Sequence, residues 1–498
     1  GDYDVDGITS STVIINILEA LGHERSKMTV YLPDREKEGY GMSEVMLRQF
    51  AKKDFNLVIT VDNGVNAKDI IDAVNDLKLD FIITDHHPLA PQRSLPKVFA
   101  LIDSKLPEQK YPFPDLAGVG VAFKLAQALI EQAKKNKINP NKNWDVVEKW
   151  LLDLVALGTV ADGMPLIGEN RTLVHYGLIV LNKTARLGLR QLINCANLTF
   201  GQIGSSEIAY RLAPWINAAG RIHHASIAYQ LLINQDEEKT RQLANQLKEA
   251  NLERQKMVRR IVTKIKKEKG DLFKKHELIV VIEENIPIGI LGLIAAELIR
   301  EYHRPTLAIS CRPENIKGSG RSMGGINVVK LLDRVKKYLI TFGGHAQACG
   351  FTLKNKAVLN DFSKEIIAIA DQELKKKSIL SSELIIDSEI ITEQINWELC
   401  EAVEKLAPFG QRNSVPRFLV RDVTIEAIKY VGKNKQHVQL IADGKKFIGF
   451  NFNKLLAEST DRQLSKGQHF DIVSEIGVNQ WNGIREIELR IVDLQFQD

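Results

Sequence analysis

Three aspartates stand close together at the start of the chain, in the segment GDYDVDGITSS. In an extended segment, the alternating positions of Asp2, Asp4 and Asp6 would place all three carboxylates on one side. Like charges at this spacing repel one another unless a cation neutralises them. The segment therefore indicates a divalent-cation site, although Asp and Gly are also common in solvated turns. Other residues have to decide between these two interpretations.

Further acidic residues follow short apolar runs in the next hundred residues. Asp62, Asp85 and Asp103 each come at the end of such a run. A lone strand-end aspartate often caps a helix, but ligands of open α/β sheets collect at the carboxyl ends of strands, so three of them predict one acidic edge. His86 and His87 follow Asp85 directly. Aspartate oxygens with one or two imidazoles suit Mn²⁺, and they suit Mg²⁺ less well because Mg²⁺ prefers oxygen ligands alone.

So many carboxylates predict two cations that share one of them. A metal pair about 3.5 to 4 Å apart polarises a phosphoryl oxygen and activates water, which is the chemistry of phosphodiester or pyrophosphate hydrolysis. Asp162 in ALGTVADGMP is a further candidate ligand, and it could equally be an aspartate in a loop between helices. The four cysteines are scattered without a CxxC pair, which argues against a zinc finger and fits free thiols in a reducing cytoplasm.

The elements that must position these residues predict a doubly wound α/β sheet. The residues between Gly7 and Gly22 have apolar side chains at helical spacing, and MTVYL, FNLVITVD, DFIITD and KVFALID predict buried strands. The segment NAKDIIDAVNDLK has the length of a crossover helix, which favours parallel strands. We also expect the natural chain to supply a strand before Asp2.

The remaining sequence predicts three further parts. Residues 112–230 are mostly helical in pattern, and the polar residues 226–270 predict a long bridging helix, with a coiled-coil arm as the alternative. A second α/β unit follows, with strands in ELIVVIEEN and PTLAIS, a helix in ILGLIAAELIREY, and glycine-rich loops in KGSGRSMGG and FGGHAQACGF. From about residue 385 onward, short strand-like runs predict a small barrel or sandwich.

Composition and charge limit the class of protein. The chain has 498 residues with 44% hydrophobic content, enough for about three domains. No apolar run reaches the roughly 18 to 20 residues that a membrane helix needs. The net charge is +5, with −5 in residues 1–110 and +10 in the rest. This asymmetry fits an acidic metal-binding module joined to modules that bind a polyanion, although lysine runs are more often solvated faces.

Several motifs resemble those of the DHH phosphoesterases. DYDVDG, VDNG, TDHH and GTVADGMPL are similar to the four motifs of that family, and GGHAQACG resembles the GGH motif of its DHH-associated domain. LPDREKEGYGMS, LAGVGVAF, NAAGR, KGSGRS and LAPFGQRN are similar to segments of one subfamily, the bacterial single-stranded-DNA-specific RecJ exonucleases. Shorter members of the family lack the carboxyl-terminal β domain, so the resemblance, which covers nearly the whole chain, is specific to this subfamily.

The resemblance implies an α/β fold in four parts and an enzymatic function. The expected parts are a DHH catalytic domain with a parallel sheet (1–225), a linker helix (226–270), a second α/β, DHH-associated domain (271–375) and an OB-like β-barrel (385–498). The implied activity is 5′-to-3′ hydrolysis of single-stranded DNA with two Mn²⁺ or Mg²⁺ ions, in DNA repair and recombination. We expect a cytoplasmic monomer without membrane contact, with a single-strand-binding protein and a helicase as candidate partners.

The resemblance also implies roles for individual residues. The positions that match the family's metal site are Asp4, Asp6, Asp62, His86 and Asp162, with Asp2, Asp85 and His87 as further ligands or as groups that orient them. The implied catalytic residues are Asp62, His86, His87 and His345, the last reaching across the cleft toward the scissile phosphate. The positions that match the DNA and 5′-phosphate contacts are Arg35, Tyr40, Arg221, Ser319 and Arg321.

Two observations on the residues themselves accompany these implied roles. Glycines around Ser319 and Arg321 would let backbone amides approach an anion, as in a phosphate-binding nest, although a simple flexible turn is the default interpretation. In the β domain, Lys435 and His437 are candidates for contact with a single strand.

Some positions depart from the family pattern, and two other functions stay open. Ile286 and Pro287 stand where the family usually has Trp-His, Trp215 replaces an arginine, and Arg412 lies in a changed QGNP motif. These changes spare every proposed metal ligand. A DHH hydrolase of short oligonucleotides would lack residues 385–498, and a non-catalytic scaffold that binds single strands should have lost metal ligands.

Overall fold

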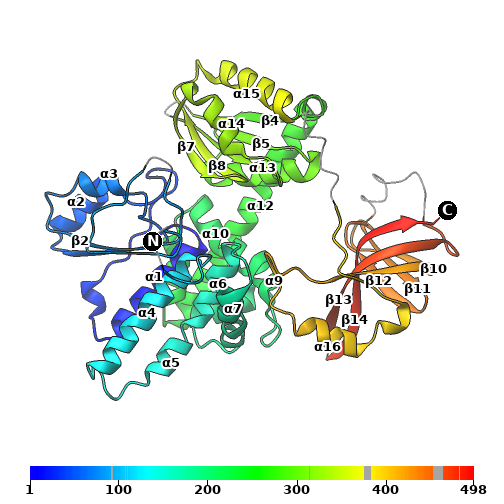
Figure 1. Ribbon diagram of the computed structural model, residues 1–498, viewed down its shortest axis with the longest axis horizontal. Coiled ribbons are helices and arrows are strands. Elements are labelled where there is room, and N and C mark those ends of the chain that lie inside the picture. Colours follow the sequence, from blue (N-terminus) through cyan, green and yellow to red (C-terminus); the bar gives the residue numbers. More distant parts are fainter. Residues whose placement is uncertain are drawn as a thin grey trace. The chain divides into compact units, whose positions relative to one another are not determined.

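The computed structural model describes residues 1–90, 93–106, 108, 110–312, 315–374, 383–452, 464–481 and 483–497. The chain divides into two compact units (Figure 1). Unit 1 comprises Gly1–Met164 and Gly168–Leu380, and unit 2 comprises Pro165–Ile167 and Ser381–Asp498. Among the described residues, no helix is both long and apolar enough to cross a membrane.

Unit 1 begins with a parallel sheet of three strands in the order β1-β2-β3. The strands are β1 (Leu57–Val61), β2 (Asp80–Asp85) and β3 (Ala100–Asp103), and their parallel pairing confirms the predicted sheet. The crossover between β1 and β2 contains only the short helix α3 (Lys68–Asp72). The prediction of a strand in MTVYL was wrong, because residues 28–32 join no ladder and Tyr31 instead accepts a hydrogen bond from the amino group of Gly1.

Helices surround this sheet and form the largest apolar core of unit 1. α1 (Val5–Ala20) starts where the Asp4 carboxylate accepts the amide of Gly7, and it packs against α4 (Gly118–Lys135) and α6 (Leu152–Ala161). The other helical segments of this region are η1 (Arg25–Lys27), α2 (Glu44–Lys52), α5 (Trp144–Lys149), α7 (Gly168–Leu181), α8 (Leu187–Cys195), α9 (Ser205–Glu207), η2 (Ile208–Leu212), α10 (Ala213–Ile222) and α11 (Ser226–Ile233). Burial of α1 on nearly all sides holds its acidic first turn rigidly in the interior.

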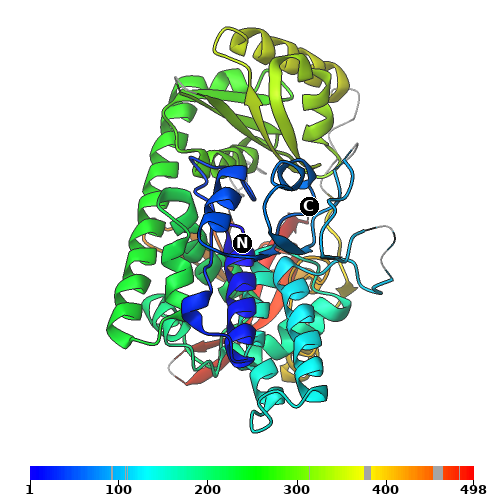
Figure 2. The ribbon, with the colours of Figure 1, turned by 90° about the vertical axis from the view of Figure 1, so that its left-hand side faces the viewer.

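A single long helix, α12 (Glu237–Phe273), leads from this body to the next one. The long helix predicted for residues 226–270 is therefore present, but it starts later than predicted, because residues 226–233 form the separate helix α11. The start of α12 is capped by Asp236, which accepts the amide of Lys239. The helix packs on α8, α10 and α11 and also on α13 (Ile288–Tyr302), and Figure 2 shows it in green along one side of unit 1. Because it has packing partners within its own chain, α12 is a bridge rather than a free coiled-coil arm.

The second sheet of unit 1 has five strands in the order β4-β5-β6-β8-β7. These are β4 (Ile279–Glu284), β5 (Thr306–Cys311), β6 (Ile316–Arg321), β7 (Leu339–His345) and β8 (Ala348–Leu353), and only β4 and β5 run parallel. α13, α14 (Val328–Arg334), η3 (Lys336–Tyr338) and α15 (Leu359–Leu374) complete this body. The second α/β unit expected from the sequence is therefore present.

Most of the glycine-rich segments of this body are strands, so their prediction as loops was largely wrong: KGSGR belongs to β6, and FGGH and ACGF belong to β7 and β8, whereas residues 322–325 and 346–347 lie outside the strands. A Cβ on Gly318 would lie 2.1 Å from the Phe351 ring, and one on Gly320 would lie 2.5 Å from Cys349 Sγ. The glycines therefore make room for side chains of the neighbouring strand. β6 pairs with β5 on one side and β8 on the other, so its amides serve the ladders and form no phosphate-binding nest.

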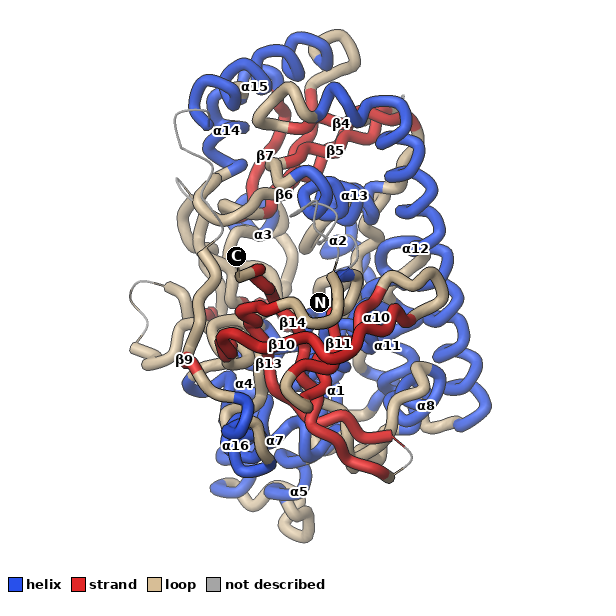
Figure 3. Tube along the Cα trace, turned by 90° about the vertical axis from the view of Figure 1, so that its right-hand side faces the viewer, coloured by secondary structure: helices blue, strands red, loops and turns tan. Residues whose placement is uncertain are grey.

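Unit 2 consists mainly of strands, drawn in red in Figure 3. Its elements are β9 (Ser388–Glu389), η4 (Thr392–Gln394), α16 (Trp397–Glu404), β10 (Arg417–Val431), β11 (His437–Ala442), β12 (Lys445–Gly449), β13 (His469–Trp481) and β14 (Ile484–Phe496). Strands β10 to β14 account for the strand-like runs that the sequence shows in this region, which are PRFLVRDVTIEAIKYV, HVQLIADG, KKFIGFNF, FDIVSEIGV and REIELRIVDLQF. The strand order is β11-β12-β14-β13-β10-β9, and an additional pairing of β10 with β11 closes the cycle of pairings, which agrees with the OB-like expectation.

Candidate metal centre and anion pocket

The acidic edge predicted for the first sheet is present. Asp62 follows β1 with a φ of 59°, a left-handed conformation that is uncommon for aspartate. Its amide donates to Thr84 at the end of β2, and the turn behind it is held by Thr60 and Asn63, which bond the backbone oxygens of Asn63 and Val61 respectively. This backbone conformation turns the Asp62 carboxylate out of the strand and toward α1 and α4. Backbone strain of this kind often marks a functional site.

The opening motif supplies the opposite side of the cluster. Asp6, in the first turn of α1, accepts the amides of Gly118 (2.7 Å) and Val119 (2.8 Å) at the start of α4. A Cβ on Gly118 would lie 2.7 Å from Asp62 Cβ, so only glycine lets α4 approach both carboxylates. A Cβ on Gly7 would lie 2.4 Å from the backbone of Asp2. The glycines of DYDVDG and LAGVGV are therefore required by close packing around the acids.

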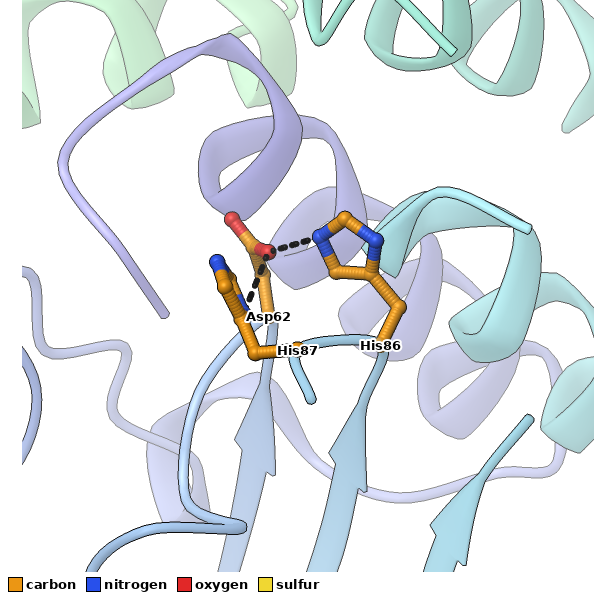
Figure 4. Close-up of side chains that lie close together, drawn as sticks. All are labelled: Asp62, His86 and His87. Carbon is orange, nitrogen blue, oxygen red and sulfur yellow. Dashed lines mark ion pairs between the residues drawn. The ribbon is translucent and has the colours of Figure 1, made fainter. Parts of the chain in front are cut away.

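His86 lies at the centre of the cluster. Its Nε2 is 3.1 Å from Asp62 Oδ1, 3.7 Å from Asp6 Oδ2 and 3.7 Å from Asp162 Oδ2. Figure 4 shows Asp62 with His86 on one side and His87 on the other, and His87 Nδ1 lies 3.9 Å from Asp62 Oδ1. Buried atoms without a hydrogen-bond partner include His86 Nε2, Asp62 Oδ1 and Asp2 Oδ1. Buried nitrogen and oxygen atoms of this type, which have no hydrogen-bond partner, fit as ligands of a metal ion.

Electrostatics also favour a cation at this cluster. Burial and the neighbouring carboxylates raise the pKa of Asp2 to about 8 and that of Asp6 to about 7, with Asp4 the main charged neighbour of both. The pKa values of Asp62 and Asp162 are raised well above the usual range for the same reasons. In contrast, burial and the charges of His87 and Lys105 lower the pKa of His86 to about 3, which keeps its imidazole neutral and able to bind a metal.

Three groups of side chains in the described part of the chain could each hold an ion. They are Asp2, Asp4 and Asp62; Asp6, His86 and Asp162; and Asp62, His86 and His87. Asp62 belongs to two of these groups, so its carboxylate is placed to be shared by two adjacent cations. The sequence alone offered the same residues but could not say which carboxylate is central.

Asp85 and Asp103, by contrast, lie outside these groups. Asp85 accepts the amides of Val65, His86 and His87 and also binds His87 Nδ1 at 2.8 Å, so its carboxylate is fully used. Burial would raise its pKa, but the hydrogen bond and charge of His87 bring it below the usual value. The same contact raises the pKa of His87 to about 8 against the opposing effect of burial. Asp85 thus orients His87.

Tyr40 and His345 are brought toward the cluster from other elements. The Tyr40 hydroxyl donates to the Asp62 backbone oxygen at 3.1 Å and lies 3.3 Å from His87 Nδ1. His345 is at the end of β7, and its pKa is lowered by burial and then by the charges of His87 and Lys105. The GGH histidine of the second body therefore lies within electrostatic reach of the clustered histidines of the first.

A second cluster in unit 1 is made of arginines. The Arg221 guanidinium donates to the backbone oxygen of Gly289 at 2.8 Å, and burial followed by the charges of Arg35, Arg254 and Arg321 lowers its pKa to about 9. Arg321 donates to Ser319 Oγ at 2.9 Å, and both side chains face α13. Among the described residues, no carboxylate forms an ion pair with any of these four arginines. Guanidinium groups that gather without a counter-ion form an anion pocket.

Two members of these clusters were missed by sequence reasoning. Arg254 comes from the middle of α12 and keeps its Nε buried without a hydrogen-bond partner. Lys105 follows β3, and its charge acts on His86, Asp162 and His345. Arg254 was hidden in a polar helix with many arginines and lysines, and Lys105 lies in no motif. For Lys105, its position two residues after the strand-end Asp103 was the available signal.

An apolar cavity of about 360 Å³ lies between α1 and the edge of β1. Its lining includes Ile14, Met46 and Leu57 but none of the clustered aspartates. The cavity is therefore separate from the aspartate and histidine cluster.

Comparison with known proteins places the chain in one family. Residues 1–159 match the DHH family, N-terminal domain, residues 275–372 the DHHA1 domain, and residues 386–493 the RecJ OB domain. The chain is 30% identical over 526 residues to the single-stranded-DNA-specific exonuclease RecJ of Dickeya dadantii, a match that covers 99% of this chain and 86% of that relative. The chain belongs to the RecJ family.

Other RecJ proteins support the fold and the chemistry of the cluster. The RecJ exonuclease of Bacillus subtilis is 36% identical over 503 residues, and the present chain spans 60% of its length. The crystal structure of RecJ from Thermus thermophilus in complex with Mn²⁺ matches the whole of this chain and 68% of that chain, with 25% identity and a TM-score of 0.82. A RecJ relative thus holds Mn²⁺, and the unpartnered atoms His86 Nε2, Asp62 Oδ1 and Asp2 Oδ1 fit as ligands of the same ion.

Proposed function

We propose that this chain is a 5′-to-3′ exonuclease that hydrolyses single-stranded DNA with two divalent cations, Mn²⁺ or Mg²⁺. The observation that carries the proposal is the presence, in one unit, of a largely buried carboxylate cluster suited to cations and a partly buried arginine cluster suited to an anion. The substrate class is supported by the relatives, which are named single-stranded-DNA-specific exonucleases.

The aspartate and histidine cluster would hold the two cations. Asp62 would be the shared ligand, because it belongs to one group with Asp2 and Asp4 and to another with His86 and His87. Asp6 and Asp162 would add ligands beside His86. When bound, the cations polarise a phosphoryl oxygen and lower the pKa of water so that it attacks phosphorus. Before binding, the helix start of α4 keeps Asp6 oriented through two amides, so the ligands need little rearrangement.

The neighbouring side chains would handle the substrate. His87, fixed by Asp85, is placed to supply a proton to the leaving oxygen, and its raised pKa suits that role. His345 would contact the scissile phosphate from β7. Tyr40, which is half-exposed beside His87, offers an aromatic face on which a base can stack.

The arginine cluster would receive the 5′-terminal phosphate. Arg221, Ser319 and Arg321 were expected there from the family resemblance, whereas Arg35 was expected near the nucleotide path. We add Arg35 and Arg254 to the phosphate site. A terminal phosphate monoester carries more charge than an internal diester, so a site with four guanidinium groups favours the strand end. Anchoring the 5′ end at a fixed position relative to the cations accounts for 5′-to-3′ polarity.

We extend the proposal to the domain organisation and the cellular role. Residues 1–225 and 271–375 form the catalytic and DHH-associated domains, residues 226–270 connect them, and residues 385–498 bind the strand with Lys435 and His437 as candidates. The enzyme acts as a cytoplasmic monomer in DNA repair and recombination. A helicase and a single-strand-binding protein, which generate and coat single strands, are its proposed partners.

The test is digestion of a single-stranded DNA that is labelled separately at each end, in Mn²⁺ and with an EDTA control. We expect immediate release of mononucleotide from the 5′-labelled strand and late release from the 3′-labelled strand, both abolished by EDTA. Release from the 3′ end first would contradict the proposed polarity. Binding without cleavage would instead support a scaffold that has kept its ligands for another purpose.

A further inference from the structure

Glu36 makes a contact that joins the two α/β bodies of unit 1. The loop from Asp34 to Tyr40 belongs to the first body of unit 1, but the Glu36 carboxylate reaches the second body. Its Oε1 accepts the amide of Ile288 at 2.6 Å, and its Oε2 lies 2.6 Å from Arg312 Nη1. The two contacts join segments that are more than 250 positions apart in the sequence.

The neighbouring residues of the same loop bond within the first body. The Arg35 guanidinium lies 4.7 Å from the centre of the Tyr3 ring, and Glu38 accepts the amide of Asp34 at 2.7 Å. Tyr40 bonds the backbone of Asp62 beside the proposed cations. The loop therefore has one side chain aimed at the metal centre, one beside the opening motif, and one, Glu36, that connects it to the second body.

The acceptor site for Glu36 is well built. Ile288 is the first residue of α13, and the helix has no side-chain cap of its own because Pro287 precedes it. The first amides of a helix lack intrahelical partners and attract a carboxylate. Arg312 is fixed by a second bond, from Nη2 to the Ile286 backbone oxygen at 3.1 Å, and Ser310 bonds the same oxygen.

The contact leads directly to the arginine cluster. α13 carries Gly289, whose backbone oxygen accepts Arg221, and Gly292, where a Cβ would lie 2.4 Å from Arg321 Nη2. A shift of the start of α13 would therefore move the anion pocket. Since Arg312 neutralises Glu36, the connection adds no net negative charge near the guanidinium groups.

We propose that Glu36 is a positioning residue. It binds the loop from Asp34 to Tyr40 to the start of α13 and thereby sets the distance between the metal centre and the anion pocket. Its effect on DNA rests on the proposed function, but the contact itself does not. The two parts are therefore tested by separate measurements on the full-length chain.

The contact is tested first without metal or DNA, by hydrogen exchange of the peptide that contains Ile288. In Glu36→Ala, the Ile288 amide loses its acceptor, and we expect its exchange to become about tenfold faster. Glu373→Gln is the control, because Glu373 forms an exposed ion pair with Arg334 in the second body, which also contains Ile288. Unchanged exchange at Ile288 in Glu36→Ala would overturn the proposal, whatever the activity.

The positioning role is tested by a double-mutant cycle with Arg312→Ala on a 5′-phosphorylated single strand. We expect Glu36→Ala to raise KM about fivefold with kcat within about twofold, and the double variant to resemble either single variant, because both remove one connection. Additive effects on KM would overturn the role, and Tm values check that each variant folds. Arg312→Met, which keeps the apolar stem and removes the charge, replaces Arg312→Ala if the latter does not fold. If the wild-type chain cleaves no DNA while the exchange result holds, the proposed function fails and the contact stands.

Discussion

The carboxylate cluster and the arginine cluster of unit 1 carry opposite charges, but in each of them groups of like charge lie close together. In the acidic cluster, burial and mutual repulsion raise the pKa of Asp2, Asp6, Asp62 and Asp162. In the basic cluster, burial and mutual repulsion lower the pKa of Arg221, while burial lowers the pKa values of Arg254 and Arg321. Each cluster thus carries an electrostatic cost in the free protein that a bound ion of opposite charge would relieve.

The clusters differ in how they are assembled. The acids come from a strand end, from the start of α1 and from the end of α6, all within the first 162 residues, where a compact sheet edge gathers them. The arginines come from a loop, two helices and a strand of the second sheet, so their proximity depends on how two bodies pack. The metal centre should therefore tolerate changes at the body contact, whereas the anion pocket should not.

The largest expected effect is at the shared carboxylate. Asp62→Ala removes a ligand common to both proposed cations, and we expect nucleotide release to fall by about 10³-fold or more, while binding of a single strand changes by less than about threefold. Single-turnover release with Mn²⁺ and a filter-binding assay measure the two quantities. The matched control is Asp69→Asn, an exposed carboxylate on α3. Near-normal turnover in Asp62→Ala would contradict the two-cation arrangement.

The next effect concerns metal and pH together. The folded pKa values of Asp2 (about 8) and Asp6 (about 7) lie above their unfolded value of 3.8, so the stability that they contribute is full below about pH 4 and is lost as the pH rises through 7 and 8. We expect the Tm of the metal-free protein to fall over this range. Mn²⁺ at one hundred times its Kd should restore about 2.7 kcal/mol at pH 8.

Calorimetric scans from pH 5 to 9, with and without Mn²⁺, measure both effects. Sodium chloride at the same ionic strength separates specific cation binding from screening. A metal-free Tm that rises between pH 6 and 8 would contradict the raised carboxylate pKa values.

A smaller effect is expected in the basic cluster. Arg321→Ala removes one charged contact to the terminal phosphate, which is worth about 2 kcal/mol, or about 30-fold in KM. The loss should apply to 5′-phosphorylated strands and should be much smaller for 5′-hydroxyl strands. Arg334→Ala, an exposed arginine of the same body, is the control. An equal loss on both substrates would remove Arg321 from the phosphate pocket.

The smallest effect is expected at Arg254, the member of the cluster that is contributed by α12. Its Nε is buried without a hydrogen-bond partner, but its guanidinium also bonds Asn251 at 2.9 Å, so part of its donor capacity is already used. We expect Arg254→Ala to raise KM for 5′-phosphorylated strands about fivefold, equivalent to about 1 kcal/mol. Kinetics on paired 5′-phosphate and 5′-hydroxyl substrates provide the measurement. An equal rise in KM for 5′-phosphate and 5′-hydroxyl strands would indicate that Arg254 stabilises α12 and does not contact the terminal phosphate.

The sequence by itself determined the elements and the chemistry of the acidic cluster. Strand-end aspartates, the helix after Gly7 and the long polar helix were predicted because hydrophobic periodicity and local turn chemistry act over short distances along the chain. The parallel sheet edge then followed, since strands of one direction bring their carboxyl ends together. These predictions needed no knowledge of distant contacts.

Only the tertiary structure decided which residues meet across the fold. It showed that Asp62 is the common carboxylate, that Asp85 orients His87, and that GSGR is a strand whose amides are used in ladders. It also brought Arg254 beside Arg221 and Glu36 to the start of α13, although nothing in their local sequence distinguishes them from solvated charges. Such contacts depend on packing between elements far apart in the chain, where burial and the absence of a counter-ion turn ordinary charged residues into parts of a site.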